Sequence, residues 1–331
     1  MKAVLNDIFS DHAVFAANKP IRIFGRGQGK IEGVFQGEKA VATIMDNCWI
    51  LEFSPRSYGG PYTVELFLDG EKKILSDVYV GEVLLCSGQS NMHFKLSSST
   101  EPKENYKNDD SVRLFIVDRL EEGERFFSEN GWLPCTKENA AEWTAIGYYV
   151  AHRIAKEKGC AVGVVACCQG ASVIEAWLPQ ESLPNSVRKI PTEQLHPDHT
   201  LYPWNPTGTL YEKMLSTVIP YAFSCVVWYQ GESNAFFPEA ETYAETLTAM
   251  IMRWRKDFLD EKLPFRIVQI ADYALYPFDK AAWETIQKEQ LAVPQKLPFV
   301  ETVVSRDVCE TDDIHPPTKS KLSLRIANSI L

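Results

Sequence analysis

The 331-residue sequence lacks two features that would indicate a membrane protein or a nucleic-acid-binding protein. No segment stays apolar over the about 18 residues that a membrane-spanning helix needs. The sequence also has no block of basic residues, and its 34 lysines and arginines against 44 acidic residues give a net charge of -10. Nucleic acids and anionic membranes bind basic surfaces, so we expect neither as a partner.

A disulfide framework and a secretory signal are missing as well. Most of the 8 cysteines lie in or beside apolar strand or helix patterns, without framework spacing and without a CxxC pair. They are therefore predicted to be buried thiols in a reducing compartment. The N-terminus carries Asp7 where a signal peptide would have its apolar core, so we predict no signal and a cytoplasmic location.

Histidine is scarce, with 6 in the chain, and this limits metal sites. The loop with His196, Asp198 and His199 has suitable ligand types, but two histidines and one carboxylate in a proline-rich loop have no defined partner set. We predict no metal and no cofactor.

The first part of the sequence is rich in short strand-like segments. Glycine, asparagine and aspartate turns separate them at intervals of about ten residues, which is typical of an antiparallel sandwich. We predict a small β-sandwich domain over residues 1–77. The segments are 21–25, 33–37, 41–45 and 62–67.

From Val78 onward strands alternate with helical patterns, which predicts an α/β domain with a parallel sheet over residues 78–331. The clearest helix spans 239–258, where apolar residues recur at steps of three and four. The next strand is predicted at 264–273 and the next helix at 281–293. Two long polar or proline-rich loops, 97–109 and 179–211, are expected to shape a pocket.

Ser90 stands directly after an apolar segment. Residues 78–85 are predicted to form a buried strand, and Gly88-Gln89-Ser90-Asn91 forms a turn at its end. The α/β proteins place their ligands at such strand ends, and a tight turn holds a nucleophile clear of its own backbone. We interpret Ser90 as the nucleophile. An ordinary loop that caps the next helix is the alternative from this segment alone.

His315 is the predicted general base. It precedes the amphipathic stretch 321–331 in a turn that also carries two aspartates. His93 lies only three residues after Ser90, too close to turn back onto the hydroxyl, and His152 falls within a helical pattern.

Asp312 is predicted to orient this base. A carboxylate three residues before a histidine can reach its Nδ1, which leaves Nε2 to accept the serine proton. As an alternative, Asp312 caps the following helix and the histidine has no chemical role. Asp313 is the other carboxylate in reach.

Two further apolar segments break at a glycine. Residues 225–229 run into Gln230-Gly231-Glu232-Ser233-Asn234, and residues 162–168 run into Gly170. An acyl-transfer site needs hydrogen-bond donors aimed at the developing oxyanion. The amides of Gln230 and Asn234 and the backbone N–H of Gly170 are the candidate donors.

Together these motifs resemble the sialate O-acetylesterase family of SGNH-type serine hydrolases over nearly the whole chain. The residues that carry the resemblance are 80–83, 86–92, Gly170 with 175–177, 228–234, 254–255 and 313–316.

The resemblance implies an SGNH-hydrolase-like three-layer α/β/α domain that deacetylates sugars through Ser90 and His315. It implies oxyanion donors from the Ser90 amide, from Gly170 and from a side chain of segment 228–234. Gln230 is our first choice and Asn234 the second. Some members work with a serine–histidine dyad, so Asp312, Asp313 or neither completes the triad.

For the substrate we expect an acetylated carbohydrate, with O-acetylated sialic acid first and acetylxylan or another acetylated polysaccharide as the alternative. A catalytically silent carbohydrate-binding protein is a third possibility, against which Ser90 and His315 both argue. The oligomeric state is left open. Sugar rings stack on aromatic faces, and an acidic sugar needs a local cation on this acidic chain. The residues expected to contact the substrate are Gln89, Asn91, Glu232, Trp177, Trp204 and Arg306.

Overall fold

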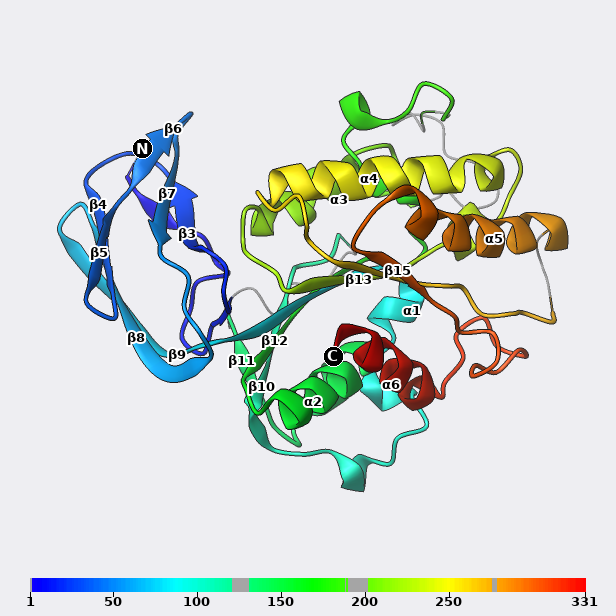
Figure 1. Cartoon of the computed structure of the whole chain (residues 1–331), viewed down its shortest axis with the longest axis horizontal. Coiled ribbons are helices and arrows are strands. Elements are labelled where there is room, and N and C mark those ends of the chain that lie inside the picture. Colours follow the sequence, from blue (N-terminus) through cyan, green and yellow to red (C-terminus); the bar gives the residue numbers. More distant parts are fainter. Residues whose placement is uncertain (1, 121–130, 188, 190–201, 276–278) are drawn as a thin grey trace.

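The computed structural model describes residues 2–120, 131–187, 189, 202–275 and 279–331. Its N-terminal part consists of β-strands, and the larger remainder combines a parallel sheet with helices (Figure 1). The fold class predicted from the sequence is confirmed.

The N-terminal part is a sandwich of two β-layers. In the short strand β4 the alternate residues Ile31, Gly33 and Phe35 are buried, as expected for a strand with one face on a core. One layer has the order β1 (Val4–Leu5), β3 (Ile21–Arg26), β7 (Cys48–Phe53) and β6 (Thr43–Met45). The other layer comprises β2 (Val14–Ala16), β4 (Ile31–Phe35), β5 (Glu38–Val41), β8 (Gly59–Leu68) and the first half of β9 (Glu71–Gly88).

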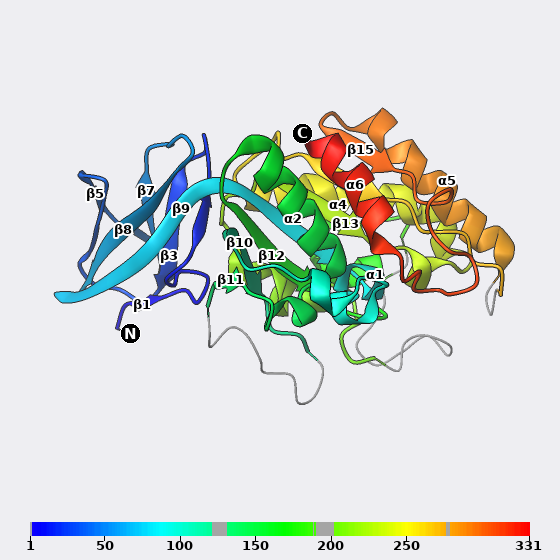
Figure 2. The ribbon, with the colours of Figure 1, turned by 90° about the horizontal axis from the view of Figure 1, so that it is seen from below.

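Strand β9 joins the two parts without a linker. Its first half pairs antiparallel with β8 from Glu71 to Val80, and its second half pairs in parallel with β12 from Glu82 to Gly88 and with β13 from Leu84 to Gly88. Figure 2 shows the strand crossing from the sandwich into the α/β part. The predicted boundary after residue 77 therefore falls inside a continuous strand, where Asp77 has a positive φ of 54°.

The central sheet places β9 between two parallel neighbours. All neighbours in the order β10-β12-β9-β13-β14-β15 are parallel, and β11 pairs antiparallel with β10 at one edge. The second half of β9, β12 and β13 are buried throughout, because helices cover both faces. The strands are β10 (Asp109–Ile116), β11 (Leu133–Cys135), β12 (Val162–Cys168), β13 (Cys225–Tyr229), β14 (Phe265–Val268) and β15 (Val300–Val303).

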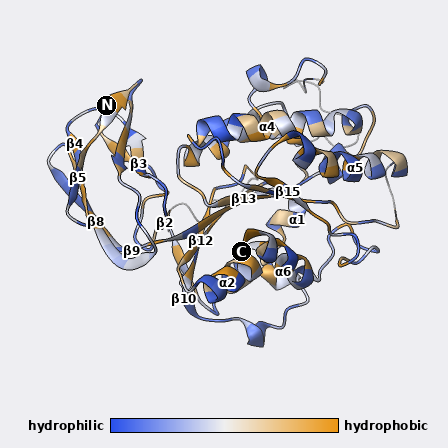
Figure 3. Cartoon of the chain, viewed as in Figure 1, coloured by the Kyte–Doolittle hydropathy of each residue, from blue (hydrophilic) through white to orange (hydrophobic). Residues whose placement is uncertain are grey.

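Helices form a layer on each side of this sheet (Figure 1). On one side lie α2 (Ala145–Lys158) and α6 (Lys319–Ile330), and on the other α3 (Thr209–Lys213), α4 (Tyr243–Asp257) and α5 (Lys280–Lys296). Figure 3 shows the central strands as hydrophobic and the helices as mixed, which is typical of a covered sheet. Within the described ranges, no helix combines the length and apolar character needed to cross a bilayer.

Several predicted elements differ in extent. Strand β14 ends at Val268 rather than at residue 273, and the predicted helix from 239 starts with a 3-10 turn over Glu239–Thr242. Further short helices in the loops are α1 (Ser90–His93) and 3-10 turns at Leu96–Ser98, Lys103–Asn105, Ala140–Glu142, Ile174–Trp177, Gln180–Ser182, Leu215–Val218 and Glu232–Asn234.

Candidate active site

The turn after β9 presents Ser90 at the carboxyl edge of the sheet. Gly88 is the last strand residue and has a φ of 135°, and a Cβ at this position would lie 2.1 Å from the carbonyl oxygen of Tyr229. Only glycine fits this close approach. Gln89 N donates to the same carbonyl oxygen at 3.0 Å, and Ser90 then opens the short helix α1.

Ser90 and His315 are hydrogen-bonded although 225 positions separate them. The distance from His315 Nε2 to Ser90 Oγ is 2.8 Å. Burial lowers the pKa of His315, the nearby Lys319 charge lowers it further, and Asp313 acts in the opposite direction. A lowered pKa keeps the imidazole neutral near pH 7, which is the form that accepts a proton.

The carboxylates before His315 do not hold its Nδ1 in the described part of the chain. Asp312, predicted to orient the imidazole, is exposed, and no hydrogen bond joins it to His315. Asp313 Oδ1 instead accepts from the backbone N of His315 at 2.8 Å. Aspartate commonly makes this bond to the backbone two residues on, so Asp313 shapes the turn.

Gly170 follows the strand beside β9. Cys168 pairs with Gly88, and Gln169 N donates to the Gly88 carbonyl at 3.0 Å, so Gly170 leaves its strand level with Ser90. Among the described residues, none accepts a hydrogen bond from the backbone N–H of Gly170 or Ser90. Both N–H groups are therefore available at the sheet edge.

The amides of Gln230 and Asn234 are engaged elsewhere. Gln230 Nε2 donates to Ser172 O at 3.0 Å and to Asn234 Oδ1 at 2.7 Å, which uses both of its hydrogens. Asn234 Nδ2 donates to both carboxylate oxygens of Glu175, at 3.2 and 2.9 Å. Buried amides need hydrogen-bond partners, and both amides find them inside the protein. The structure therefore does not agree with the prediction that one of them faces the oxyanion.

Gln89, Asn91 and Glu232, expected to contact the substrate, connect the loops behind Ser90. Gln89 Oε1 accepts from the backbone N of Gly231 and of Ser233, at 3.3 and 3.2 Å. Asn91 Nδ2 donates to Glu232 Oε1 at 2.6 Å. All three side chains are buried. They hold the site together from within and are not on its surface.

Lys319 is a buried cation at the site that the sequence analysis did not select. Its Nζ donates to Asn91 Oδ1 at 2.6 Å. Burial lowers the pKa of Lys319 to about 8, and Cys309, Glu232 and acidic neighbours act against this shift. In the sequence it is an ordinary lysine at the start of a helix. Its position four residues after His315 is the one signal that could have identified it.

The aromatic and cationic residues expected at the substrate have other contacts. Trp177 is fully buried against Trp228 and Trp254, so it cannot reach a sugar. Trp204 is 7% exposed, and its Nε1 donates to Gly170 O at 3.1 Å. Arg306 Nε donates to Asp272 Oδ1 at 2.7 Å on a half-exposed side chain. Trp177 is thus a core residue, and Trp204 holds the Gly170 carbonyl.

Asn205 is a second residue that sequence reasoning missed. It is fully buried, accepts from Val173 N at 3.1 Å and donates to Ala171 O at 3.0 Å. Ala171 has a positive φ of 51°, which is uncommon outside glycine. Asn205 therefore stabilises the loop that follows Gly170. An asparagine inside a long loop gives no signal of this in the sequence.

Within the described residues, the two histidines rejected as the base, His93 and His152, form no hydrogen bond to Ser90. Burial lowers the pKa of His93 to about 3, with Arg119 and Lys95 adding to the shift, so it stays neutral and inside the fold. His152 lies within α2, with Nδ1 2.8 Å from the Tyr148 carbonyl oxygen. The loop with His196, Asp198 and His199, at which we predict no metal, lies outside the described residues.

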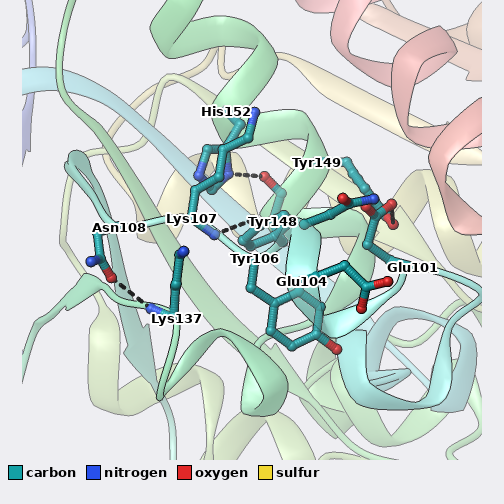
Figure 4. Close-up of a pocket in the computed structure, with 10 residues that line it drawn as sticks. Glu101, Glu104, Tyr106, Lys107, Asn108, Lys137, Tyr148, Tyr149 and His152 are labelled. Atoms are coloured by element: carbon teal, nitrogen blue, oxygen red, sulfur yellow. Dashed lines mark hydrogen bonds between the residues drawn. The ribbon is translucent and has the colours of Figure 1, made fainter.

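A cavity of about 830 Å³ lies apart from the Ser90–His315 pair, between α2 and the loop after residue 100 (Figure 4). Tyr149 donates to Glu101 at 2.7 Å on one side, and Lys137 lies on the other. The loop predicted at 97–109 thus lines a cavity, whose lining includes neither Ser90 nor His315. A hydrogen bond from Thr100 N to Pro317 O, at 3.2 Å, ties this loop to the His315 segment.

A parallel sheet covered on both faces, with a hydrogen-bonded serine and histidine at its carboxyl edge, is the arrangement of the α/β serine hydrolases. A family model described as carbohydrate esterase, sialic acid-specific acetylesterase matches residues 80–330, and the chain belongs to this family.

Curated relatives and a solved structure agree with this membership. The chain is 26% identical over 310 residues to sialate O-acetylesterase of Homo sapiens, covering 84% of this chain and 59% of that protein. It is 25% identical to the Rattus norvegicus protein of the same name, covering 85% and 62%. A carbohydrate acetylesterase from Xanthomonas citri superposes with a TM-score of 0.85 at 28% identity, covering 98% of this chain and 74% of that one. The chain thus spans less than two thirds of the curated relatives' length.

Proposed function

We propose that this protein is a serine esterase that removes O-acetyl groups from sugars through an acetyl-enzyme on Ser90. The observation that carries the proposal is the 2.8 Å contact between Ser90 Oγ and His315 Nε2 at the sheet edge. The family membership supports the acetyl ester and the carbohydrate as the substrate class.

In the first half-reaction His315 Nε2 takes the proton of Ser90 as Oγ bonds to the acetyl carbonyl carbon. The tetrahedral intermediate collapses, its bond to the sugar oxygen breaks, and the imidazolium returns the proton to that oxygen. In the second half-reaction His315 takes a proton from water, which attacks the acetyl-enzyme. Acetate leaves, and the serine regains its proton.

The oxyanion of both intermediates is proposed to bind the backbone N–H groups of Ser90 and Gly170. These two groups leave adjacent strands at the same level, and no described residue accepts from them. Loss of one such donor typically costs about 3 kcal/mol of transition-state stabilisation. The Trp204 bond to the Gly170 carbonyl supports this role, because it holds the peptide that directly follows the Gly170 N–H.

For the sugar we propose O-acetylated sialic acid, since the curated relatives are named sialate O-acetylesterases. An acetylated neutral polysaccharide such as acetylxylan is the second candidate. One observation favours it: Arg306, the cation expected at a sialate carboxylate, is already bound to Asp272.

Ser90→Ala tests the nucleophile. The variant should fold, because the side chain is half-buried and loses only its bond to His315, and turnover of p-nitrophenyl acetate should fall by at least about a thousandfold. Ser87→Ala is the matched control on the same strand, since the buried Ser87 hydroxyl has no partner in the described residues. Near-wild-type turnover by Ser90→Ala would overturn the proposed function, whereas a wild-type protein without turnover above background would favour the silent carbohydrate-binding protein.

Acetate release identifies the sugar. O-acetyl sialic acid and acetylated xylo-oligosaccharides are compared at equal concentration with the wild-type enzyme and with Arg306→Ala. A preference for the sialate that disappears in Arg306→Ala supports an acidic-sugar site. A preference for the xylo-oligosaccharide, unchanged by the substitution, supports the neutral substrate.

A further inference from the structure

Lys319 is an ammonium group enclosed beside the serine–histidine pair. Its side chain is 1% exposed, and it is the first residue of α6, four residues after His315. Nζ lies 4.7 Å from the ring centroid of Phe94 and 5.6 Å from that of Tyr229. Lysine is rarely buried to this extent without a paired carboxylate. In the described part of the chain, the one hydrogen bond of the Lys319 ammonium goes to Asn91, and the ammonium forms no direct ion pair.

Asn91 can take only one orientation between its neighbours. Its Nδ2 donates to Glu232 Oε1 at 2.6 Å and to the Ile314 carbonyl oxygen at 2.9 Å, both of which are acceptors. Its Oδ1 faces the ammonium of Lys319, which can only donate. The ammonium therefore fixes the direction of the amide that binds the carbonyl just before His315.

The hydrogen bond from Asn91 to the Ile314 carbonyl joins the segment that carries Ser90 to the segment that carries His315. Asn91 follows Ser90 in α1, and Ile314 precedes His315, so a single side chain connects the nucleophile turn to the histidine loop. Lys319 holds that side chain from the far end of the loop. A shift of Asn91 would change the Ser90–His315 distance, which is critical for proton transfer.

Neighbouring charges act on both the Lys319 ammonium and the His315 imidazole. Glu232, Glu310, Asp313 and the Cys309 thiol favour the ammonium of Lys319, against the cost of its burial. The His315 imidazole senses the Lys319 charge and, in the opposite direction, Asp313. A cation near an imidazole favours its neutral form.

Resting on the esterase function above, we propose that Lys319 is the positioning residue of the site. Through Asn91 it holds the His315 loop against the nucleophile turn, and its charge maintains the neutral imidazole that takes the Ser90 proton. Only the positioning part resembles what a triad carboxylate does, since such a carboxylate would favour the imidazolium; no described carboxylate is bonded to His315 Nδ1.

Lys319→Met and Lys319→Arg test the two parts of the role in the full chain. The profile of kcat/KM against pH is measured from pH 5 to 9 with p-nitrophenyl acetate. In Lys319→Met the acid limb should move to higher pH by on the order of one unit, because the imidazole loses a neighbouring cation and binds its proton more tightly. Its kcat should fall by about tenfold or more with KM within about threefold. Lys319→Arg, which keeps the charge, should retain the wild-type acid limb.

Lys321→Met is the matched control, since Lys321 is exposed on the same helix and should show the wild-type profile. A purely structural role for Lys319 would lower stability without moving the acid limb. Lys319→Met with the wild-type acid limb and the wild-type kcat overturns the proposal.

If circular dichroism shows that Lys319→Met does not fold, Asn91→Ala tests the proposal instead. It breaks the link but leaves the ammonium, so kcat should fall by about tenfold or more while the acid limb stays in place. A wild-type kcat in Asn91→Ala overturns the proposal as well. Ser90→Ala in the same assay keeps the two ideas apart: a turnover that depends on Ser90, beside an unchanged Lys319→Met, removes only the Lys319 proposal.

Discussion

Two buried asparagine–glutamate pairs lie at the carboxyl edge of the sheet and differ in one neighbour. The Asn91 cluster contains Asn91, Glu232 and Lys319, and the Asn234 cluster contains Asn234, Glu175 and Gln230. In both, an asparagine amide donates to a carboxylate. Only the Asn91 cluster contains a cation.

The difference sets the chemistry of each cluster. In the Asn91 cluster the ammonium of Lys319 favours the charged form of Glu232, although burial still raises the pKa of that carboxyl. In the Asn234 cluster burial raises the pKa of Glu175 to about 7, and the carboxyl of Glu239 adds to the rise. The first cluster contacts the loops that carry the reacting pair, and the second holds Ile174 N and Ser172 O behind Gly170. We infer that the first sets reactivity and the second sets local stability.

Alanine at each asparagine gives the largest expected contrast. Asn91→Ala should lower kcat between about tenfold and a hundredfold, since the amide joins the two loops of the reacting pair. Asn234→Ala should lower the free energy of unfolding by about 2 kcal/mol, because Gln230 and Glu175 lose buried hydrogen bonds, with kcat of the folded protein within about tenfold. Urea unfolding and initial rates of both variants measure this. Equal losses of kcat in the two would remove the distinction.

Glu175→Gln should change the pH dependence of stability. The folded pKa of about 7 lies above the usual 4.5, so the folded state binds more protons between these values and wild-type stability falls as pH rises from about 4.5 to 7. Without this carboxyl, stability should decrease less as the pH rises. Between pH 5 and pH 8 the free energy of unfolding of the variant should therefore increase relative to wild type by on the order of 1 to 3 kcal/mol.

Urea unfolding at pH 5, 6, 7 and 8 measures this gain. Glu232→Gln is the comparison in the other cluster and should gain less, because Lys319 favours the charged Glu232. A gain that does not vary with pH would show that Glu175 does not titrate in this range.

Aspartate-to-asparagine substitutions before His315 should have the smallest effects. Asp312→Asn should change kcat/KM by less than about twofold, because the side chain is exposed and does not bond the imidazole. Asp313→Asn should move the acid limb slightly to lower pH, because Asp313 raises the His315 pKa. Profiles of kcat/KM against pH measure both. A loss of several hundredfold in Asp312→Asn would restore it as a triad acid.

Local patterns predicted the elements well. Apolar strands that end in glycine-rich turns predicted β9, β12 and β13 with Ser90 and Gly170 at their ends, because a buried parallel strand must be apolar and its exit needs a tight turn. Steps of three and four predicted α4, because one helix face packs on the sheet. The boundary after residue 77 was placed by the change of pattern, which does not reveal that β9 continues through it.

The partners of polar side chains were not predictable in the same way. Gln230 and Asn234 have the right type and spacing for oxyanion donors, yet Gln230 donates to Ser172 O and to Asn234 itself, and Asn234 donates to Glu175. Trp177 looks like a sugar platform in the sequence and is enclosed by two other tryptophans. A side chain's type states which bonds it can form, but not which partner the fold brings to it.

The sequence by itself determined the strands, the main helices and a short set of candidate groups, because periodicity, turn residues and residue chemistry are local properties. Only the tertiary structure decided that Ser90 meets His315, that Asp312 stays in solvent, and that Lys319 is enclosed against Asn91. These contacts join residues up to 228 positions apart, and they follow from the order of the strands in the sheet, which brings the loops at one edge together.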